Sequence, residues 1–113
     1  MSLYTLVYIT HSNISEARKL ASILVREKLI ACANIMPQVE SVFMWDDHID
    51  WKDEVVIIAK TKLELFPKVK EKVCELHHYH TPCVISVPLS DGNPSFLNWV
   101  SENTLPPNEE TST

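Results

Sequence analysis

The spacing of apolar residues predicts a strand followed by an amphipathic helix at the start of the chain. Residues 3–10 (LYTLVYIT) are β-branched, aromatic or aliphatic with apolar side chains on both faces, which is typical of a central strand covered on both sides. Asn13 then stands three residues before Glu16, a capping arrangement. Beyond it, apolar residues recur at helical spacing at Ile14, Ala17, Leu20, Ala21 and Leu24. This pattern predicts a surface helix that lies on a sheet.

Two long extended segments predict a hairpin in the middle of the chain. Residues 30–45 have an extended pattern that is interrupted at Pro37, which indicates a bulge or a sheet edge. Residues 48–61 first alternate strictly and then become a buried apolar run, and Asp46 and Asp47 form a tight turn between the two segments. Strands usually have five or six residues, so a hairpin of this length is expected to project from the domain and to need a packing partner.

The second half of the chain predicts another helix, an edge strand and a short final helix. Apolar residues recur at helical spacing over residues 66–76, after a second capping pair formed by Thr61 and Glu64. Residues 83–89 predict a strand, and a proline near its end suits a sheet edge. Residues 94–103 predict the final helix.

The predicted order is β-α-β-β-α-β followed by a short C-terminal helix. This is the order of the α+β ferredoxin-like fold, an antiparallel sheet with both main helices on one face, here with a long β-hairpin. We expect a single domain over residues 1–104. Residues 105–113 (LPPNEETST) have no periodicity and predict a disordered tail. Because this fold carries many unrelated activities, it does not by itself indicate a function.

Composition narrows the classes of partner. The chain has 113 residues, with 10 Lys and Arg against 15 Asp and Glu and a formal charge of −5. We therefore expect no nucleic-acid partner, because phosphate binding depends on clustered Lys and Arg. The longest apolar run, residues 55–59, is too short to span a bilayer, so we expect no membrane association. Gly92 is the only glycine, which excludes Gly-rich phosphate loops.

Cysteine usage predicts the compartment. The three cysteines form no C-x-x-C motif and leave an odd thiol if any two of them pair, which favours a reducing environment. The first residues also lack the basic start and apolar core of a signal peptide. We expect a cytoplasmic protein.

Several separated motifs resemble one known family. They are residues 31–35 (ACANI), 41–45 (SVFMW), 54–55 (EV), 60–61 (KT), 77–82 (HHYHTP) and 96–100 (FLNWV). Their order and spacing are similar to those of the divalent-cation tolerance (CutA) family, and the match runs from about Tyr4 to about Asn103.

The resemblance implies a ferredoxin-like subunit that forms a tight homotrimer through its long hairpins. It also implies a role in tolerance of divalent metals, copper above all, with a copper or zinc ion as the bound cofactor and no catalysis. The alternative is a non-catalytic trimeric scaffold, or a small-molecule signalling protein, with no direct metal role. An unknown protein or small molecule would then be the partner.

Three histidines in the loop segment are candidate metal ligands. His77, His78 and His80 lie within four residues, and imidazole is a ligand that Cu(II) and Zn(II) favour. His77 coincides with the histidine of the family's loop motif; its alternative role is to cap the preceding helix. For His78 and His80 the alternative is simple exposure to water.

Cysteine adds two candidates. Cys32 lies in the 31–35 motif, where the alternative is inert packing in the core. Cys83 follows the loop proline and is close to His80 in sequence, but its alternative is to begin a buried strand. One metal-binding pattern of the family has a cysteine on the first strand, and this chain has Ile9 there. We therefore expect a site that rests on His77 with helpers, and that binds with modest affinity.

A second group of residues is expected at an intersubunit cleft. The resemblance places Lys60 beside that cleft, with a carboxylate partner for which Glu54 of the same strand is the candidate. Tyr79 and Trp45 are further cleft candidates. For Trp45 the alternative is an anchor in the core or in an interface, because large aromatic residues dominate such burial.

Overall fold

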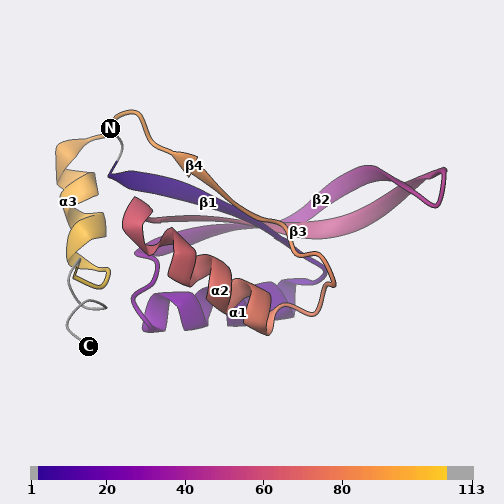
Figure 1. The fold of residues 1–113 in the computed structure, drawn as a ribbon, viewed down its shortest axis with the longest axis horizontal. Coiled ribbons are helices and arrows are strands. Elements are labelled where there is room, and N and C mark those ends of the chain that lie inside the picture. Colours follow the sequence, from indigo (N-terminus) through magenta and orange to yellow (C-terminus); the bar gives the residue numbers. More distant parts are fainter. Residues whose placement is uncertain (1–2, 107–113) are drawn as a thin grey trace.

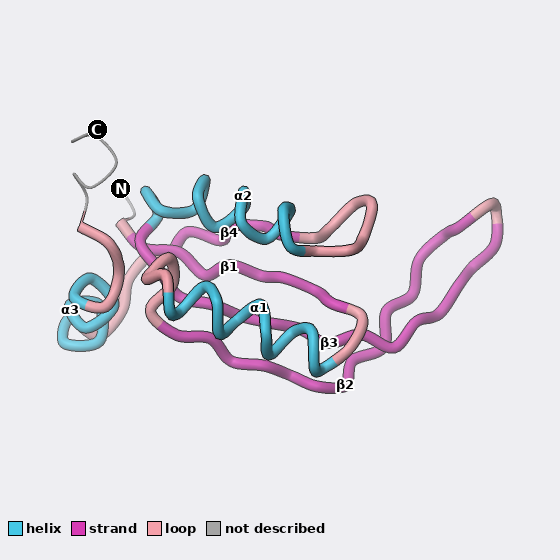
Figure 2. Tube along the Cα trace, turned by 90° about the horizontal axis from the view of Figure 1, so that it is seen from below, coloured by secondary structure: helices cyan, strands magenta, loops and turns pink. Residues whose placement is uncertain are grey.

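The computed structural model describes residues 3–106, which form one antiparallel sheet and three α-helices. The elements are β1 (Tyr4–His11), α1 (Ile14–Arg26), β2 (Cys32–Trp45), β3 (His48–Lys62), the 3-10 turn η1 (Leu63–Leu65), α2 (Phe66–Leu76), β4 (Val84–Pro88) and α3 (Pro94–Glu102). The sheet order is β2-β3-β1-β4, with α1 and α2 on the same face (Figures 1 and 2). The predicted α+β ferredoxin-like fold is confirmed.

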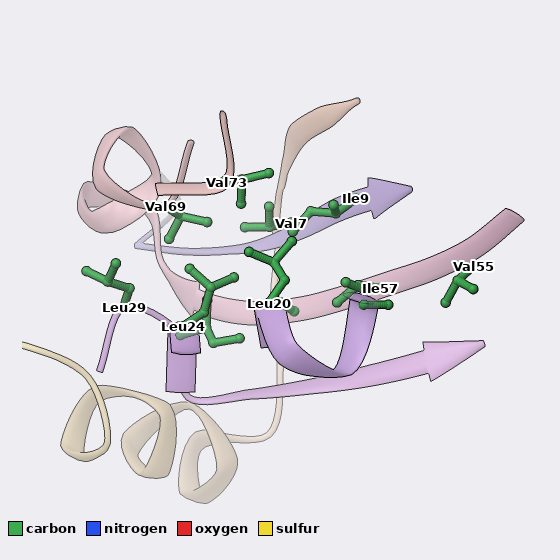
Figure 3. Close-up of a cluster of buried hydrophobic side chains, with 12 residues drawn as sticks. Val7, Ile9, Leu20, Leu24, Leu29, Val55, Ile57, Val69 and Val73 are labelled. Carbon is green, nitrogen blue, oxygen red and sulfur yellow. The ribbon is translucent and has the colours of Figure 1, made fainter. Parts of the chain in front are cut away.

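The hydrophobic core fills the space between this sheet face and the two helices. Alternate residues of the central strands, such as Val7 and Ile9 of β1, are fully buried against Leu20 and Leu24 of α1 (Figure 3). The helix begins as predicted, because Asn13 Oδ1 accepts the backbone N–H of Glu16 at 2.8 Å. The helical and strand periodicities of the sequence thus meet in one core.

The opposite face of the sheet is more open than predicted. We expected β1 to be covered on both sides, but its residues alternate between full burial and partial exposure. Tyr8 on the second face is exposed, as are its neighbours Ile85 and Val87 on β4. The reason is topological: α1 and α2 pack on the same face, so these three residues of the other face gain little cover within the described part of the chain.

The long hairpin of β2 and β3 projects beyond the helices (Figure 1). Asp46 and Asp47 form its predicted two-residue turn, and both have positive φ, 49° and 66°, as a type I′ turn requires. The strand register shifts between Met36 and Val39, which places a bulge at the predicted interruption, Pro37.

The predicted capping pair of Thr61 and Glu64 is wrong. Thr61 is a buried residue of β3, and its hydroxyl donates to the carbonyl of Leu29 at 2.7 Å. The chain then passes through η1, and α2 begins without a side-chain cap, with Pro67 in its first turn. The hydroxyl of Thr61 therefore satisfies a buried carbonyl and not a helix terminus.

The predicted boundary at residue 104 is one residue too early. Leu105 packs against the core, and its N–H donates to the carbonyl of Lys28 at 3.0 Å. Its own carbonyl accepts from the buried ammonium of Lys62 at 2.6 Å. Most of the tail predicted over 105–113 lies outside the described residues, so disorder there stays a prediction. No helix between residues 3 and 106 is long and apolar enough to cross a membrane.

Candidate metal site at the histidine loop

The residues between α2 and β4, 77–83, form a loop that we call the histidine loop. Its first residue, His77, is buried and follows the last turn of α2, where its backbone N–H donates to the carbonyl of Val73. The ring Nε2–H of His77 donates to the carbonyl of Thr10 at 2.7 Å, which leaves Nδ1 as the acceptor nitrogen. Metal-binding histidines usually make this kind of bond to a backbone carbonyl with the nitrogen that does not ligate.

His11, at the end of β1, lies directly against His77. The two rings stack with centroids 4.0 Å apart and an interplanar angle of 15°. His11 is 2% exposed, and its Nδ1 accepts the N–H of Ser12 at 2.9 Å. His78 completes the group from the solvent side, with its centroid 5.3 Å from that of His11 and its Nε2 3.2 Å from Ser12 Oγ.

These three residues, His11, His77 and His78, form the histidine cluster. Each offers one ring nitrogen, and these nitrogens lie within 4.8 Å of one another. On one tetrahedral ion with metal–nitrogen distances of about 2.0–2.1 Å, the nitrogens would be about 3.4 Å apart. The donor set fits a divalent transition-metal ion. Ligation of one ion would require the ring stack to open so that the nitrogens come closer together.

The surroundings keep His11 neutral. Its pKa is lowered from 6.5 to about 4, first by burial and then by the neighbouring His77 and His78, although Glu16 and Glu54 act in the opposite direction. Only neutral imidazole has a lone pair for a metal ion. This member of the cluster is therefore in the binding-competent charge state at neutral pH.

Two residues predicted for the cleft, Glu54 and Tyr79, lie together beside the cluster. The Tyr79 hydroxyl donates to Glu54 Oε2 at 2.8 Å, and the hydroxyl of Ser41 donates to Glu54 Oε1 at 2.6 Å. The ammonium of Lys52 lies 4.0 Å from the centroid of the Tyr79 ring. Burial raises the pKa of the Tyr79 hydroxyl; Lys52 acts against this and the bond to Glu54 acts with it, so the pKa stays raised and the hydroxyl remains a donor.

Three further candidates from the sequence, Cys32, Lys60 and Trp45, are not part of the histidine cluster. Cys32 pairs with Lys60 across β2 and β3, on the sheet face away from α1 and α2, and the Lys60 ammonium donates to Asn34 Oδ1. Within one chain Lys60 does not pair with Glu54, because the two lie six residues apart on β3, about 20 Å along the strand. A pairing between subunits stays a prediction. Trp45 is exposed at the end of the hairpin, beside the turn.

Two helpers named from the sequence lie outside the cluster. Cys83 is half-buried, and burial raises the pKa of its thiol, which disfavours the thiolate that binds metals. His80 is exposed. Within residues 3–106 the one group of three metal-ligating side chains that converge is the histidine cluster, and it includes neither of them.

Sequence reasoning missed His11. The predicted first strand ends at residue 10, one residue before His11, although a signal is present: His11 continues the alternation of Val7 and Ile9 on the buried face. That alternation indicates burial without naming a neighbour. The stack on His77 depends on where the histidine loop, 66 residues later, returns to the sheet.

Comparisons with known proteins place the chain in a family. The sequence model described as CutA1 divalent ion tolerance protein matches residues 5–103. The chain belongs to the CutA1 family. A CutA1 relative from Thermus thermophilus, named divalent-cation tolerance protein CutA, is 39% identical over 98 residues, which cover 87% of this chain and 95% of the relative. A protein of the same name from Archaeoglobus fulgidus is 37% identical over 100 residues, covering 88% and 97%.

Solved CutA1 structures have the same fold. The crystal structure of the divalent ion tolerance protein CutA1 from Ehrlichia chaffeensis has a TM-score of 0.88 to this chain at 35% identity. The match covers 94% of this chain and 99% of that one. The family and these relatives are named for tolerance of divalent cations and not for a reaction.

Proposed function

We propose that this CutA1 chain is a non-catalytic protein that binds a divalent transition-metal ion, copper or zinc, in a homotrimer. The observation that carries the proposal is the convergence of three imidazole nitrogens within 4.8 Å. The names of the relatives, which are called divalent-cation tolerance proteins, support a role in the response to such ions.

The donor set favours copper or zinc over calcium or magnesium. Imidazole suits Cu(II) and Zn(II), whereas Ca²⁺ and Mg²⁺ take oxygen ligands. Three nitrogens leave one position for water or another small ligand. Without a metal ion, ring nitrogens of His11 and His77 are already hydrogen-bonded and the two rings are stacked. Breaking these contacts costs part of the binding free energy, so we expect modest affinity.

The projecting hairpin supports a homotrimer. Val42, Met44, Ile49 and Trp51 share one face of the hairpin and are 54%, 67%, 66% and 61% exposed. The open sheet face adds further exposed apolar residues, and β2 and β4 are the edge strands of the sheet. Large exposed apolar surfaces mark interaction sites. The threefold arrangement is the one that the family resemblance implies.

The cysteines support a proposal for the cellular compartment of the protein. All three are unpaired, and Cys74 is exposed. An exposed free thiol persists in a reducing compartment, and we propose the cytoplasm.

Calorimetric titration with Zn²⁺ and with Cu²⁺ tests the proposed function. We expect the untagged wild type to bind one ion per chain, and both His77→Ala and His78→Ala to lose affinity by at least tenfold. His78 is exposed, so its variant keeps the fold if the buried His77 proves necessary for folding. His48→Ala, which removes an exposed histidine of the hairpin, is the matched control and should bind as the wild type does.

Two results would contradict the proposal. Equal binding by the wild type and by both cluster variants would move the metal elsewhere on the chain. No binding by the wild type, with a trimer still present, would favour the scaffold or small-molecule signalling alternative.

A further inference from the structure

A hydrogen-bond chain ties the histidine loop to the hairpin. It runs from Ser41 of β2 to the carboxylate of Glu54 on β3, and from there to the hydroxyl of Tyr79 in the loop. Its two bonds measure 2.6 and 2.8 Å and use both carboxylate oxygens. The chain therefore joins the projecting part of the molecule to the segment that carries two of the three histidines.

Glu54 is suited to be the fixed member of this chain. Glu54 is 9% exposed. It takes part in no ion pair within residues 3–106, where the ion pair that forms joins Lys72 and Glu27. A buried carboxylate depends on its hydrogen-bond donors, because an unsatisfied charged acceptor is costly. Ser41 and Tyr79 are those donors, so the position of Glu54 strongly constrains the Tyr79 hydroxyl.

Tyr79 in turn contacts every ring of the histidine cluster. Its ring centroid lies 4.5 Å from that of His77, 5.0 Å from His78 and 6.1 Å from His11. Its backbone N–H also donates to His77 Nδ1 at 3.2 Å, and this bond must be released before that nitrogen can bind a metal ion. A residue in this position keeps the three imidazoles close together, while the opening of the ring stack and the release of this bond remain part of the cost of binding.

We propose that Tyr79, held by Glu54, is the positioning residue of the metal site. This inference rests on the proposed function, because it assigns what sets the affinity and geometry of the same histidine cluster. With the hydroxyl anchored, the loop is ordered before the ion arrives, and binding does not have to supply that ordering. Tyr79 itself does not ligate the ion.

The variant Tyr79→Phe tests the proposal most cleanly. It keeps the ring, its contacts with the imidazoles and the charge of Glu54, and it removes only the anchoring hydroxyl. Partners of metal-binding histidines typically change affinity by about 10- to 100-fold when they are lost, so we expect Zn²⁺ to bind about tenfold more weakly. The visible absorption bands of bound Co²⁺, which report coordination geometry, should shift or lose intensity as well.

Tyr4→Phe is the matched control. It also removes a single tyrosine hydroxyl, one that bonds to Ser101 Oγ at 2.7 Å at the opposite end of β1 from His11. We expect it to bind Zn²⁺ with the wild-type affinity and to give the wild-type Co²⁺ spectrum. A general effect of one lost hydrogen bond on stability would be equal in the two variants.

Substitutions of Glu54, alone and combined with Tyr79→Phe, test whether the two residues act as one link. The single variants are Glu54→Gln and Glu54→Ala. An amide oxygen can still accept from the tyrosine hydroxyl, so we expect Glu54→Gln to lose less affinity than Glu54→Ala. The double variant Glu54→Ala with Tyr79→Phe should bind about as weakly as Glu54→Ala alone, because residues of one hydrogen-bonded network are not additive.

The outcomes separate the positioning role from the metal site itself. Wild-type affinity and an unchanged Co²⁺ spectrum in Tyr79→Phe would overturn the positioning role and leave the proposed metal site intact. Additive losses in the double variant would show that Glu54 acts through its charge and not through Tyr79. No binding of Zn²⁺ or Co²⁺ by the wild type would refute the proposed function and the positioning role together.

Discussion

His11 shows how one buried side chain combines packing with chemistry. It occupies the last buried position of β1 and fills it with an imidazole stacked on His77. An aliphatic residue would fill the same space but would offer no nitrogen. The cost of burying a titratable ring appears as a pKa of about 4, caused first by burial and then by the two histidines beside it.

This lowered pKa predicts a specific loss of stability in acid. Above pH 6.5 His11 is neutral in both the folded and the unfolded chain. Between pH 6.5 and about 4 the unfolded chain takes up a proton that the folded chain does not, so the free energy of unfolding falls as the pH falls. For this shift the loss amounts to about 3 kcal/mol and is complete below pH 4.

The variant His11→Phe isolates the effect, because it keeps an aromatic ring in the stack and removes the titration. Chemical denaturation of metal-free protein at pH 7 and at pH 4 should give a smaller decrease for the variant than for the wild type. Equal decreases would show that His11 does not account for the acid sensitivity.

At the scale of elements, the hairpin turn uses residues that suit it imperfectly. Asp46 and Asp47 both adopt positive φ, a conformation that strains residues other than glycine but that Asp and Asn tolerate best. The preferred pairs for such a turn, Asp-Gly and Asn-Gly, have glycine at the second position.

Asp47→Gly should therefore stabilise the hairpin, by about 1 kcal/mol. The matched control is Asp53→Gly in the extended part of β3, where glycine only adds freedom to the unfolded chain and should destabilise the protein. Thermal melting of both variants checks the prediction, and a lower melting temperature for Asp47→Gly would contradict it.

Local signals in the sequence predicted most elements, and the failures are tertiary. Asn13 capped α1, Pro37 marked the bulge and the Asp pair formed the turn because each acts on its own neighbours. The capping role predicted for Thr61 failed because a hydroxyl can bond to a partner from any part of the chain. Its partner is the carbonyl of Leu29, 32 residues away in sequence. The same limit applies to the site: the sequence named His77 and His78 from their adjacency, but only the fold brings His11 to them.

At the scale of the whole molecule, residue 105 belongs to the folded part. Leu105→Ala should lower the free energy of unfolding by about 1–2 kcal/mol, because it removes a half-buried side chain that packs on the core. Leu3→Ala is the control, since Leu3 is largely exposed, and it should change stability by less than about 0.5 kcal/mol. Chemical denaturation of both variants measures these changes in the free energy of unfolding. Equal changes would show that the folded domain ends at residue 104.

The proposed trimer makes a prediction for the hairpin face. Trp51→Asp places a charge in the middle of the exposed apolar face and should convert the trimer to smaller species. Val25→Asp, at an exposed apolar position on α1, should remain a trimer. Light scattering at micromolar concentration distinguishes these masses, and a wild type far from three times 12.9 kDa would refute the assembly.

Native mass spectrometry of the untagged protein, equilibrated with Zn²⁺ and freed of excess ion, tests the central claim most directly. It reports assembly and metal content on the same particle. Because one histidine cluster belongs to each chain, we predict a trimer that carries three zinc ions, and a trimer with none from the variant without His77 and His78. A wild-type particle of another size, or a trimer without bound zinc, would contradict the account.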